Sequence, residues 1–135
     1  MTTERIRSAV RQNAVSAAIA AACMLYFGFR AFAEPTGASL FERSNWILFH
    51  TLRIGGIAMA LVAIGSWLGY RPVLMVDAVV STVVGLLFIV SGGGMLIDGG
   101  AAIQNALVIL FGLMFVSAGV RTARRHAWLN RARDA

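Results

Sequence analysis

The sequence predicts an all-α fold, an integral membrane four-helix bundle of antiparallel up-down hairpins. Hydrophobic residues make up 59% of the 135-residue chain and charged residues 13%. A soluble domain of this size buries too small a fraction of its surface to hide so much apolar area, which excludes a water-soluble globule. Disorder is excluded as well, because disordered chains are rich in charge. Four uncharged runs each have the roughly 17–25 residues that a helix needs to cross a bilayer.

The first two helices are predicted over residues 13–33 and 46–69. The segment 34–39 contains Pro, Gly and Ser, and it is expected to separate the two helices. Trp46 and Trp67 lie 21 residues apart, which is about 31 Å along a helix. That length matches the hydrocarbon core of a bilayer, and tryptophan prefers both of its interfaces.

The last two helices are predicted over residues 73–97 and 101–121, with a basic tail over residues 122–135. Pro72 stands where it can open the third helix, and the turn at residues 98–100 separates the third helix from the fourth. Connections this short place neighbouring helices antiparallel. The chain is thus expected to be a single membrane domain over residues 1–135, with the tail as a helical extension whose arginines attract anionic lipid headgroups.

The distribution of arginine predicts the orientation. All twelve basic residues are Arg, and the formal net charge is +6. Nine of them belong to the two terminal segments and the middle turn, and they are Arg5, Arg7, Arg11, Arg71, Arg121, Arg124, Arg125, Arg131 and Arg133. The positive-inside rule therefore places both termini in the cytoplasm. A basic set without lysine, in a chain rich in Ala and Gly, is typical of GC-rich bacterial genomes, so a bacterial inner membrane is expected.

A competing interpretation concerns the first helix. Three arginines precede an Ala-rich run that ends in Ala31-Phe32-Ala33, a pattern that resembles a signal-peptidase site. Cleavage after Ala33 would leave three helices and move the N-terminus to the outside. Arg30 just before the site, and the length of the apolar run, favour an uncleaved helix.

Each predicted helix carries a stripe of small residues of the kind that lets membrane helices approach closely. The expected packing positions are Gly56, Ala60, Gly65, Gly69, Gly85, Gly92, Gly112 and Gly119. Gly65 and Gly69 form a GxxxG motif, which is weak evidence in a chain with 14 glycines. Packing within one chain is the preferred interpretation, and a dimer interface is the alternative.

An intramembrane polar site is predicted from Asp77, Ser81, Asn105 and Arg121. Asp77 is the sharpest candidate, because an ionisable group within a membrane segment is expensive and often functional. It could carry a proton or bind a cation. The structural interpretation, which we prefer, pairs Asp77 with Arg71 or Arg121 at the same boundary.

An outer polar cluster is predicted from His50, Arg53 and Asp98 at the opposite side of the membrane. Its alternative interpretation is a set of interfacial charges with no further role. Ligation of haem is not expected, because His50 is the one histidine near the membrane.

The triple glycine of residues 92–94 allows two interpretations. Either the third helix ends near Val90 and unwound carbonyls face an ion, or the glycines serve close helix packing. Packing is preferred. Asn105 would hydrogen-bond to a freed carbonyl in the first case.

The expected function is that of a small structural or accessory subunit that packs in the bilayer with itself or with a larger membrane complex. The alternative is an oligomeric ion or proton channel or transporter that uses Asp77 and the Gly92–Gly94 segment. Catalytic and phosphate-binding motifs are missing from the sequence, so no enzyme, cofactor, metal or nucleic acid is expected. The single Cys23 excludes an internal disulfide.

Overall fold

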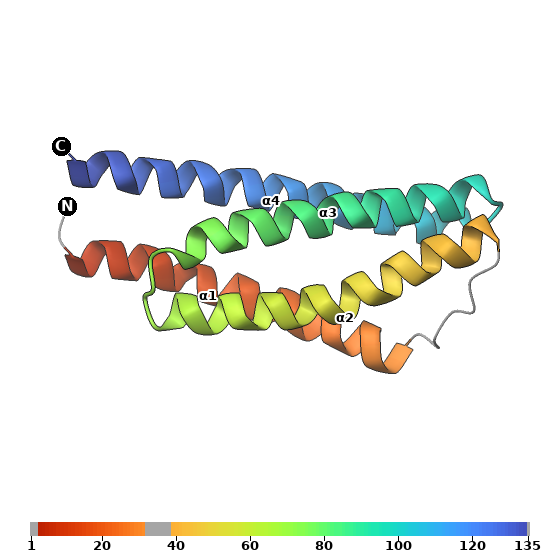
Figure 1. The fold of residues 1–135 in the computed structure, drawn as a ribbon, viewed down its shortest axis with the longest axis horizontal. Helices are drawn as coiled ribbons and strands as arrows, with labels where there is room; N and C mark the ends of the chain where they lie inside the picture. Colours follow the sequence, from red (N-terminus) through yellow and green to blue (C-terminus); the bar gives the residue numbers. More distant parts are fainter. Residues whose placement is uncertain (1–2, 32–38, 135) are drawn as a thin grey trace.

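The computed structural model describes residues 3–31 and 39–134, and within them the chain forms an up-down bundle of four α-helices (Figure 1). The helices are α1 (Thr3–Tyr26), α2 (Leu40–Trp67), α3 (Val73–Ile97) and α4 (Ala102–Asp134), and a short π-helix, η1 (Phe27–Ala31), continues α1. The N- and C-terminal ends lie at the same end of the bundle. The predicted all-α up-down four-helix architecture is confirmed.

All four helices are long and apolar enough to cross a membrane, which gives the chain the architecture of a multi-pass membrane protein. Large apolar side chains cover the outer face of α2, where Ile54, Ile57, Leu61 and Ile64 are more than half exposed. In water this exposure would be costly, whereas lipid tails are as apolar as the side chains themselves.

The helices extend beyond the predicted spans at their polar ends. α1 begins at Thr3 instead of residue 13, and α4 runs without a break past its predicted span to Asp134, which confirms that the tail is a helical extension. The added segments are rich in Arg and Ala, which are strong helix formers. The basic tail is therefore the straight continuation of α4, and its Leu129 is fully buried in the bundle. The cleavage alternative concerns Ala33, which lies outside the described residues.

α2 begins at Leu40, six residues before the predicted start, because a capping box precedes it. The Ser39 hydroxyl accepts a hydrogen bond from the Glu42 backbone N–H at 3.1 Å. In return, the Ser39 backbone N–H donates to the Glu42 carboxylate at 3.3 Å. This reciprocal pair satisfies two N–H groups that have no partner inside the helix.

Among the described residues, two turns join consecutive helices, α2 to α3 and α3 to α4, and each contains a glycine at positive φ. Gly69 has φ +74° and Gly99 has φ +82°, a conformation that side-chain-bearing residues rarely adopt. α2 ends at Trp67, so Gly69 belongs to the turn and not to a helix face. The prediction that Gly69 packs within a helix is therefore wrong, and the GxxxG motif is split by the end of α2.

The closest helix contact joins α3 to α4 through glycines spaced seven residues apart. A Cβ atom added to Gly85 would lie 2.6 Å from the Gly112 carbonyl oxygen, and the reciprocal distance is also 2.6 Å. An added Cβ on Gly92 would lie 3.0 Å from the Asn105 carbonyl oxygen of α4, and one on Gly119 would lie 2.9 Å from the Ala78 carbonyl oxygen of α3. Without side chains at these positions, the two backbones come into direct van der Waals contact.

The remaining predicted packing positions lie on α2 and make looser contacts. Gly56 faces Leu25 of α1, where an added Cβ would meet side-chain and backbone atoms from 2.9 Å. Gly65 faces Val73 across the α2–α3 turn, and Ala60 is half-buried beside the apolar core. α2 therefore packs against α1 on one side and α3 on the other.

Candidate functional site

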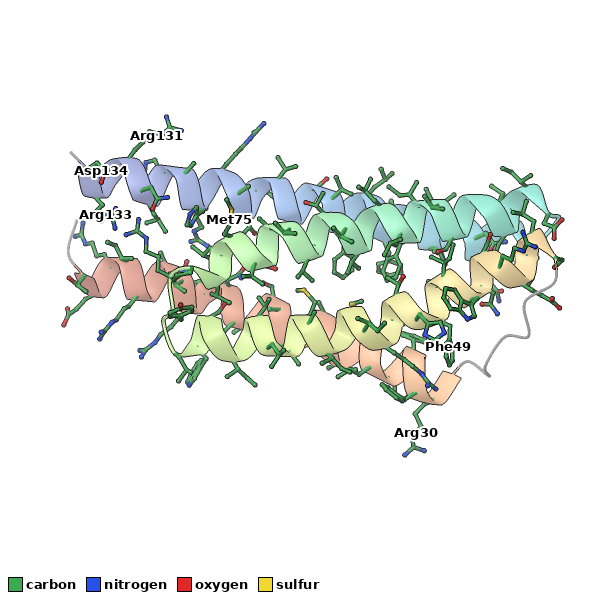
Figure 2. The ribbon with its side chains drawn as sticks, viewed as in Figure 1. Arg30, Phe49, Met75, Arg131, Arg133 and Asp134 are labelled. Atoms are coloured by element: carbon green, nitrogen blue, oxygen red, sulfur yellow. The ribbon has the colours of Figure 1, made fainter. Side chains whose placement is uncertain are left out.

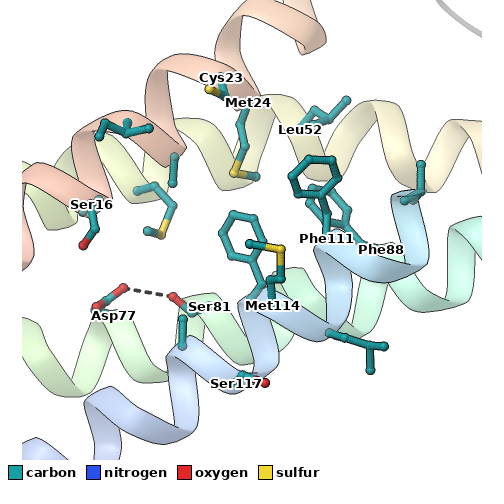
Figure 3. A pocket seen from close by; sticks show the side chains of 18 of the residues that line it. Ser16, Cys23, Met24, Leu52, Asp77, Ser81, Phe88, Phe111, Met114 and Ser117 are labelled. Atoms are coloured by element: carbon teal, nitrogen blue, oxygen red, sulfur yellow. Dashed lines mark hydrogen bonds between the residues drawn. The ribbon is translucent and has the colours of Figure 1, made fainter. Parts of the chain in front are cut away.

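The four helices do not close into a ring. α1 packs on α2, α2 on α3 and α3 on α4, whereas α1 and α4 touch only slightly. At the end that carries the termini, Arg125 of α4 donates to the Gln12 side-chain oxygen of α1 at 2.9 Å. Farther along, the two helices enclose a groove of about 750 Å³, with α2 and α3 behind it (Figure 3).

One face of α1 and one face of α4 line this groove. The α1 side contributes mostly small side chains at helical spacing, namely Asn13, Ser16, Ala17, Ala20 and Cys23. The α4 side contributes larger ones, which include Leu107, Phe111, Met114 and Arg121. Residues three and four apart share a helix face, so the lining is continuous along both walls. The small residues of α1 are not matched by close contact with α4, and this mismatch leaves the groove open.

A buried carboxylate forms the polar end of the groove. The Asp77 side chain is 4% exposed and accepts hydrogen bonds from three uncharged donors on three helices. Asn13 Nδ2 of α1 lies 2.7 Å from Oδ2, Ser81 Oγ of α3 lies 3.0 Å from Oδ1, and Thr122 Oγ1 of α4 lies 3.4 Å from Oδ2. Figure 3 shows the bond from Ser81 to Asp77 at one end of the lining.

The expected pairing of Asp77 with an arginine is wrong. Within the described part of the chain, no basic side chain lies within 4 Å of the Asp77 carboxylate. Arg71 instead donates to Asn130 Oδ1 at 2.6 Å, which ties the α2–α3 turn to the end of α4. Arg121 lines the groove and is exposed. Asp77 therefore has hydrogen-bond donors around it and no adjacent counter-charge.

The predicted polar site is split by the structure. Asp77, Ser81 and Arg121 line the groove, but Asn105 does not. Asn105 lies at the other end of α4, 17 residues before Thr122, which is about 25 Å along a helix. Its side chain is 5% exposed, and its Nδ2 has no hydrogen-bond partner. Asn13 and Thr122, which were not predicted as members of the site, lie beside Asp77 instead.

The predicted outer cluster is not held together by contacts among its members. Asp98 Oδ2 accepts a hydrogen bond of 2.8 Å from the Phe41 backbone N–H at the start of α2. The His50 ring packs against Trp46 and Phe49, with centroid distances of 4.3 Å and 5.3 Å. His50 and Asp98 therefore have local structural roles at this end of the bundle.

Arg53, the third member, supports the π-helix. Its Nε donates to the Gly28 carbonyl oxygen of η1 at 2.8 Å. Its guanidinium carbon lies 4.4 Å from the Phe29 ring centroid and 4.1 Å from that of Phe49. Figure 2 shows Phe49 and Arg30 at this end of the bundle, opposite Arg131 and Arg133. The charge is thus offset by a carbonyl and two aromatic faces.

The triple glycine lies inside a continuous helix. α3 runs to Ile97, so it does not end near Val90, and the backbone of residues 92–94 is helical. A Cβ on Gly92 would meet Ile109 Cγ1 at 2.8 Å and the Asn105 carbonyl oxygen at 3.0 Å, whereas one on Gly93 would meet nothing within 4 Å. Close packing explains Gly92, and the unwound interpretation is wrong.

Comparisons of this chain with protein-family models, with curated proteins and with solved structures find no match. Within residues 3–31 and 39–134, no group of three or more His, Cys, Asp or Glu side chains comes together as a metal site. The groove and its polar end are therefore the features from which a function can be argued.

Proposed function

We propose that this chain is a small accessory membrane protein that holds a lipid-like molecule in the groove between α1 and α4. The observation that carries the proposal is the slight contact between α1 and α4, which leaves a groove of about 750 Å³ between them. Small-molecule sites typically measure about 300–1,000 Å³. The lining is apolar over most of its length and polar at one end, which matches a molecule with an apolar body and one polar head.

The length and polarity of the groove match a lipid-like molecule. The lining from Asn13 to Phe27 extends about 21 Å along α1, with the Asp77 carboxylate at one end. A second copy of the chain, or a helix of another protein, is the alternative occupant, and identification of the copurified molecules distinguishes it from a lipid.

The proposed accessory role depends on other proteins in the membrane. We propose that the protein works with copies of itself or within a larger membrane complex, in a bacterial inner membrane, without a catalytic step of its own. The exposed apolar faces of α2 and α3 support such lateral packing, since they meet lipid or another protein equally well. The end that carries both termini would face the cytoplasm.

Copurification tests this proposal. The protein is isolated in mild detergent, and bound small molecules and proteins are identified and counted by mass spectrometry. The wild type is expected to retain about one lipid-like molecule per chain. Ala20→Phe, which fills the groove, should lose it, whereas Ala18→Phe should retain it because Ala18 is exposed and lies outside the lining. Equal retention by both variants would overturn the proposal.

The second candidate function is that of an ion or proton conductor, and the observation that favours it is the buried Asp77 carboxylate within the groove. The Gly92–Gly94 segment no longer supports it, because α3 is helical there. Proton and cation flux into liposomes should then depend on Asp77 and fall to the level of empty liposomes in Asp77→Asn. Wild-type flux at that same level would eliminate this candidate.

A further inference from the structure

We infer that the molecule held in the groove is an amphiphile with a primary ammonium head, and that Asp77 binds this head. The inference rests on the proposed function and names the chemical class of the molecule bound in the groove, called the guest below. It is drawn from the position of the Asp77 carboxylate, its missing counter-charge and the shape of the lining beyond it.

The Asp77 carboxylate lines the groove and still has the capacity to accept a further hydrogen bond. Ser81 donates to Oδ1, and Asn13 and Thr122 donate to Oδ2. An ionised carboxylate has about four acceptor sites, so the three donors leave one open, and Oδ1 has a single partner. A head group that donates hydrogen bonds can therefore be added without breaking the existing ones.

The charge of the head group follows from the surroundings of Asp77. A carboxylate that is 4% exposed and lacks a basic side chain within 4 Å, among the described residues, is costly in a membrane. Two arginines at this end of the bundle have other partners, since Arg71 bonds to Asn130 and Arg125 to Gln12. A bound ammonium would supply the missing positive charge and a charge-assisted hydrogen bond.

Arg121 is the one basic side chain in the lining, and its position is compatible with a cationic guest. It is exposed, and its long stem lets the charged group reach the headgroup region and water. An anionic head would be attracted to Arg121 and repelled by Asp77. Asp77 thus predicts a preference for a cationic head and Arg121 a preference for an anionic one. A series of ligands that differ in head-group charge shows which preference the groove has.

The rest of the lining fits an extended apolar chain. From the level of Asp77, the groove continues past Met24 and Met114 to Phe88 and Phe111. Phe88 is 11 residues after Asp77 on α3, which places it about 16 Å farther along the helix. Cys23 is ten residues after Asn13 on α1, at a similar distance of about 15 Å. A long alkyl chain whose head lies on Asp77 would therefore pass Cys23.

The test uses a photoreactive hexadecanol with a diazirine near its chain end, in phosphatidylcholine nanodiscs that contain the full chain. Adducts are located by mass spectrometry on groove residues such as Cys23 and Met114, and on Ile57 and Leu61 of the outer face of α2 as an internal reference. Hexadecylamine, hexadecanol and hexadecyl sulfate then compete for the groove adducts.

Hexadecylamine is expected to compete about tenfold better than hexadecanol on the wild type, because a hydrogen bond to a charged group is worth about one decade in affinity or more. In Asp77→Asn this advantage should disappear. Asp134→Asn removes the same charge from an exposed site at the same end of the bundle, so it should leave the tenfold preference unchanged.

Three outcomes would overturn the inference. Equal competition by all three ligands on the wild type would leave a groove that binds apolar guests without head-group preference, so that the proposed function stands alone. The strongest competition by hexadecyl sulfate would assign the head-group site to Arg121. Labelling of the groove no stronger than that of Ile57 and Leu61 would overturn the proposed function as well. The wild-type ranking decides these cases even if Asp77→Asn does not fold.

Discussion

The side-chain amide of Asn13 donates a hydrogen bond of 2.7 Å to the Asp77 carboxylate and so joins α1 to α3, helices that are otherwise separated by α2 in the packing order. The bond fixes the position of α1 at the polar end of the groove. Toward the other end, α1 and α4 diverge, and the space between them becomes the groove.

Replacement of Asn13 by Ala is expected to lower the free energy of unfolding by about 1–3 kcal/mol, because a buried charged acceptor loses a donor. Titration of detergent-solubilised protein with sodium dodecyl sulfate, followed by circular dichroism, measures the change. Gln12→Ala is the matched control. It breaks an exposed bond to Arg125, and surface substitutions of this kind stay within about 0.5 kcal/mol. Equal losses in the two variants would contradict a special role for the Asn13–Asp77 bond.

The triple glycine offers a matched pair of adjacent positions. Gly92→Ala places a Cβ at 2.8 Å from Ile109 Cγ1, so we expect overpacking to cost about 1–3 kcal/mol. Gly93→Ala meets nothing within 4 Å and is expected to stabilise the helix by up to about 1 kcal/mol. The same unfolding titration checks both variants. A destabilised Gly93→Ala would mean that this face of α3 is covered by another molecule.

Arg53 is expected to resist replacement by lysine. Lys keeps the charge but loses the Nε that donates to Gly28 and the planar group between Phe29 and Phe49. Arg53→Lys should therefore cost about 1–3 kcal/mol, the sum of one hydrogen bond and the cation–π contacts. Arg30→Lys, at an exposed position nearby, should be neutral. A neutral Arg53→Lys would show that the positive charge alone supports η1.

The sequence was sufficient for those features that depend on local pattern. Uncharged runs predicted the number of helices, and glycine and proline predicted the two short turns. The helical tail that runs to Asp134 was predicted as well, whereas the start of α1 at Thr3 was missed because the predicted span began after the first charges. The early start of α2 was also missed, although Ser39 and Glu42 have the spacing of a capping box.

The partners of Asp77 were not readable, because they depend on how far each helix is rotated in the bundle. Ser81 was selected since it lies one turn along the same helix, but Asn13 and Thr122 come from α1 and α4. The groove between α1 and α4 could not be predicted for the same reason. A stripe of small residues on α1 predicts close packing equally well against either neighbour, and only the tertiary structure shows that it meets α2 and leaves α4 apart.

The orientation in the membrane gives the last prediction. The end of the bundle that carries the termini also carries Arg131 and Arg133, whereas Arg30 lies at the opposite end (Figure 2). By the positive-inside rule, a reporter that is active only in the cytoplasm should work when fused after Ala135 in a bacterial host. A reporter that is active only outside the cytoplasm should work when the chain is cut and fused at the α3–α4 turn, after Gly99. The opposite activities at these two sites would show that the membrane orientation is the reverse, with the Asp77 end of the groove at the outer leaflet.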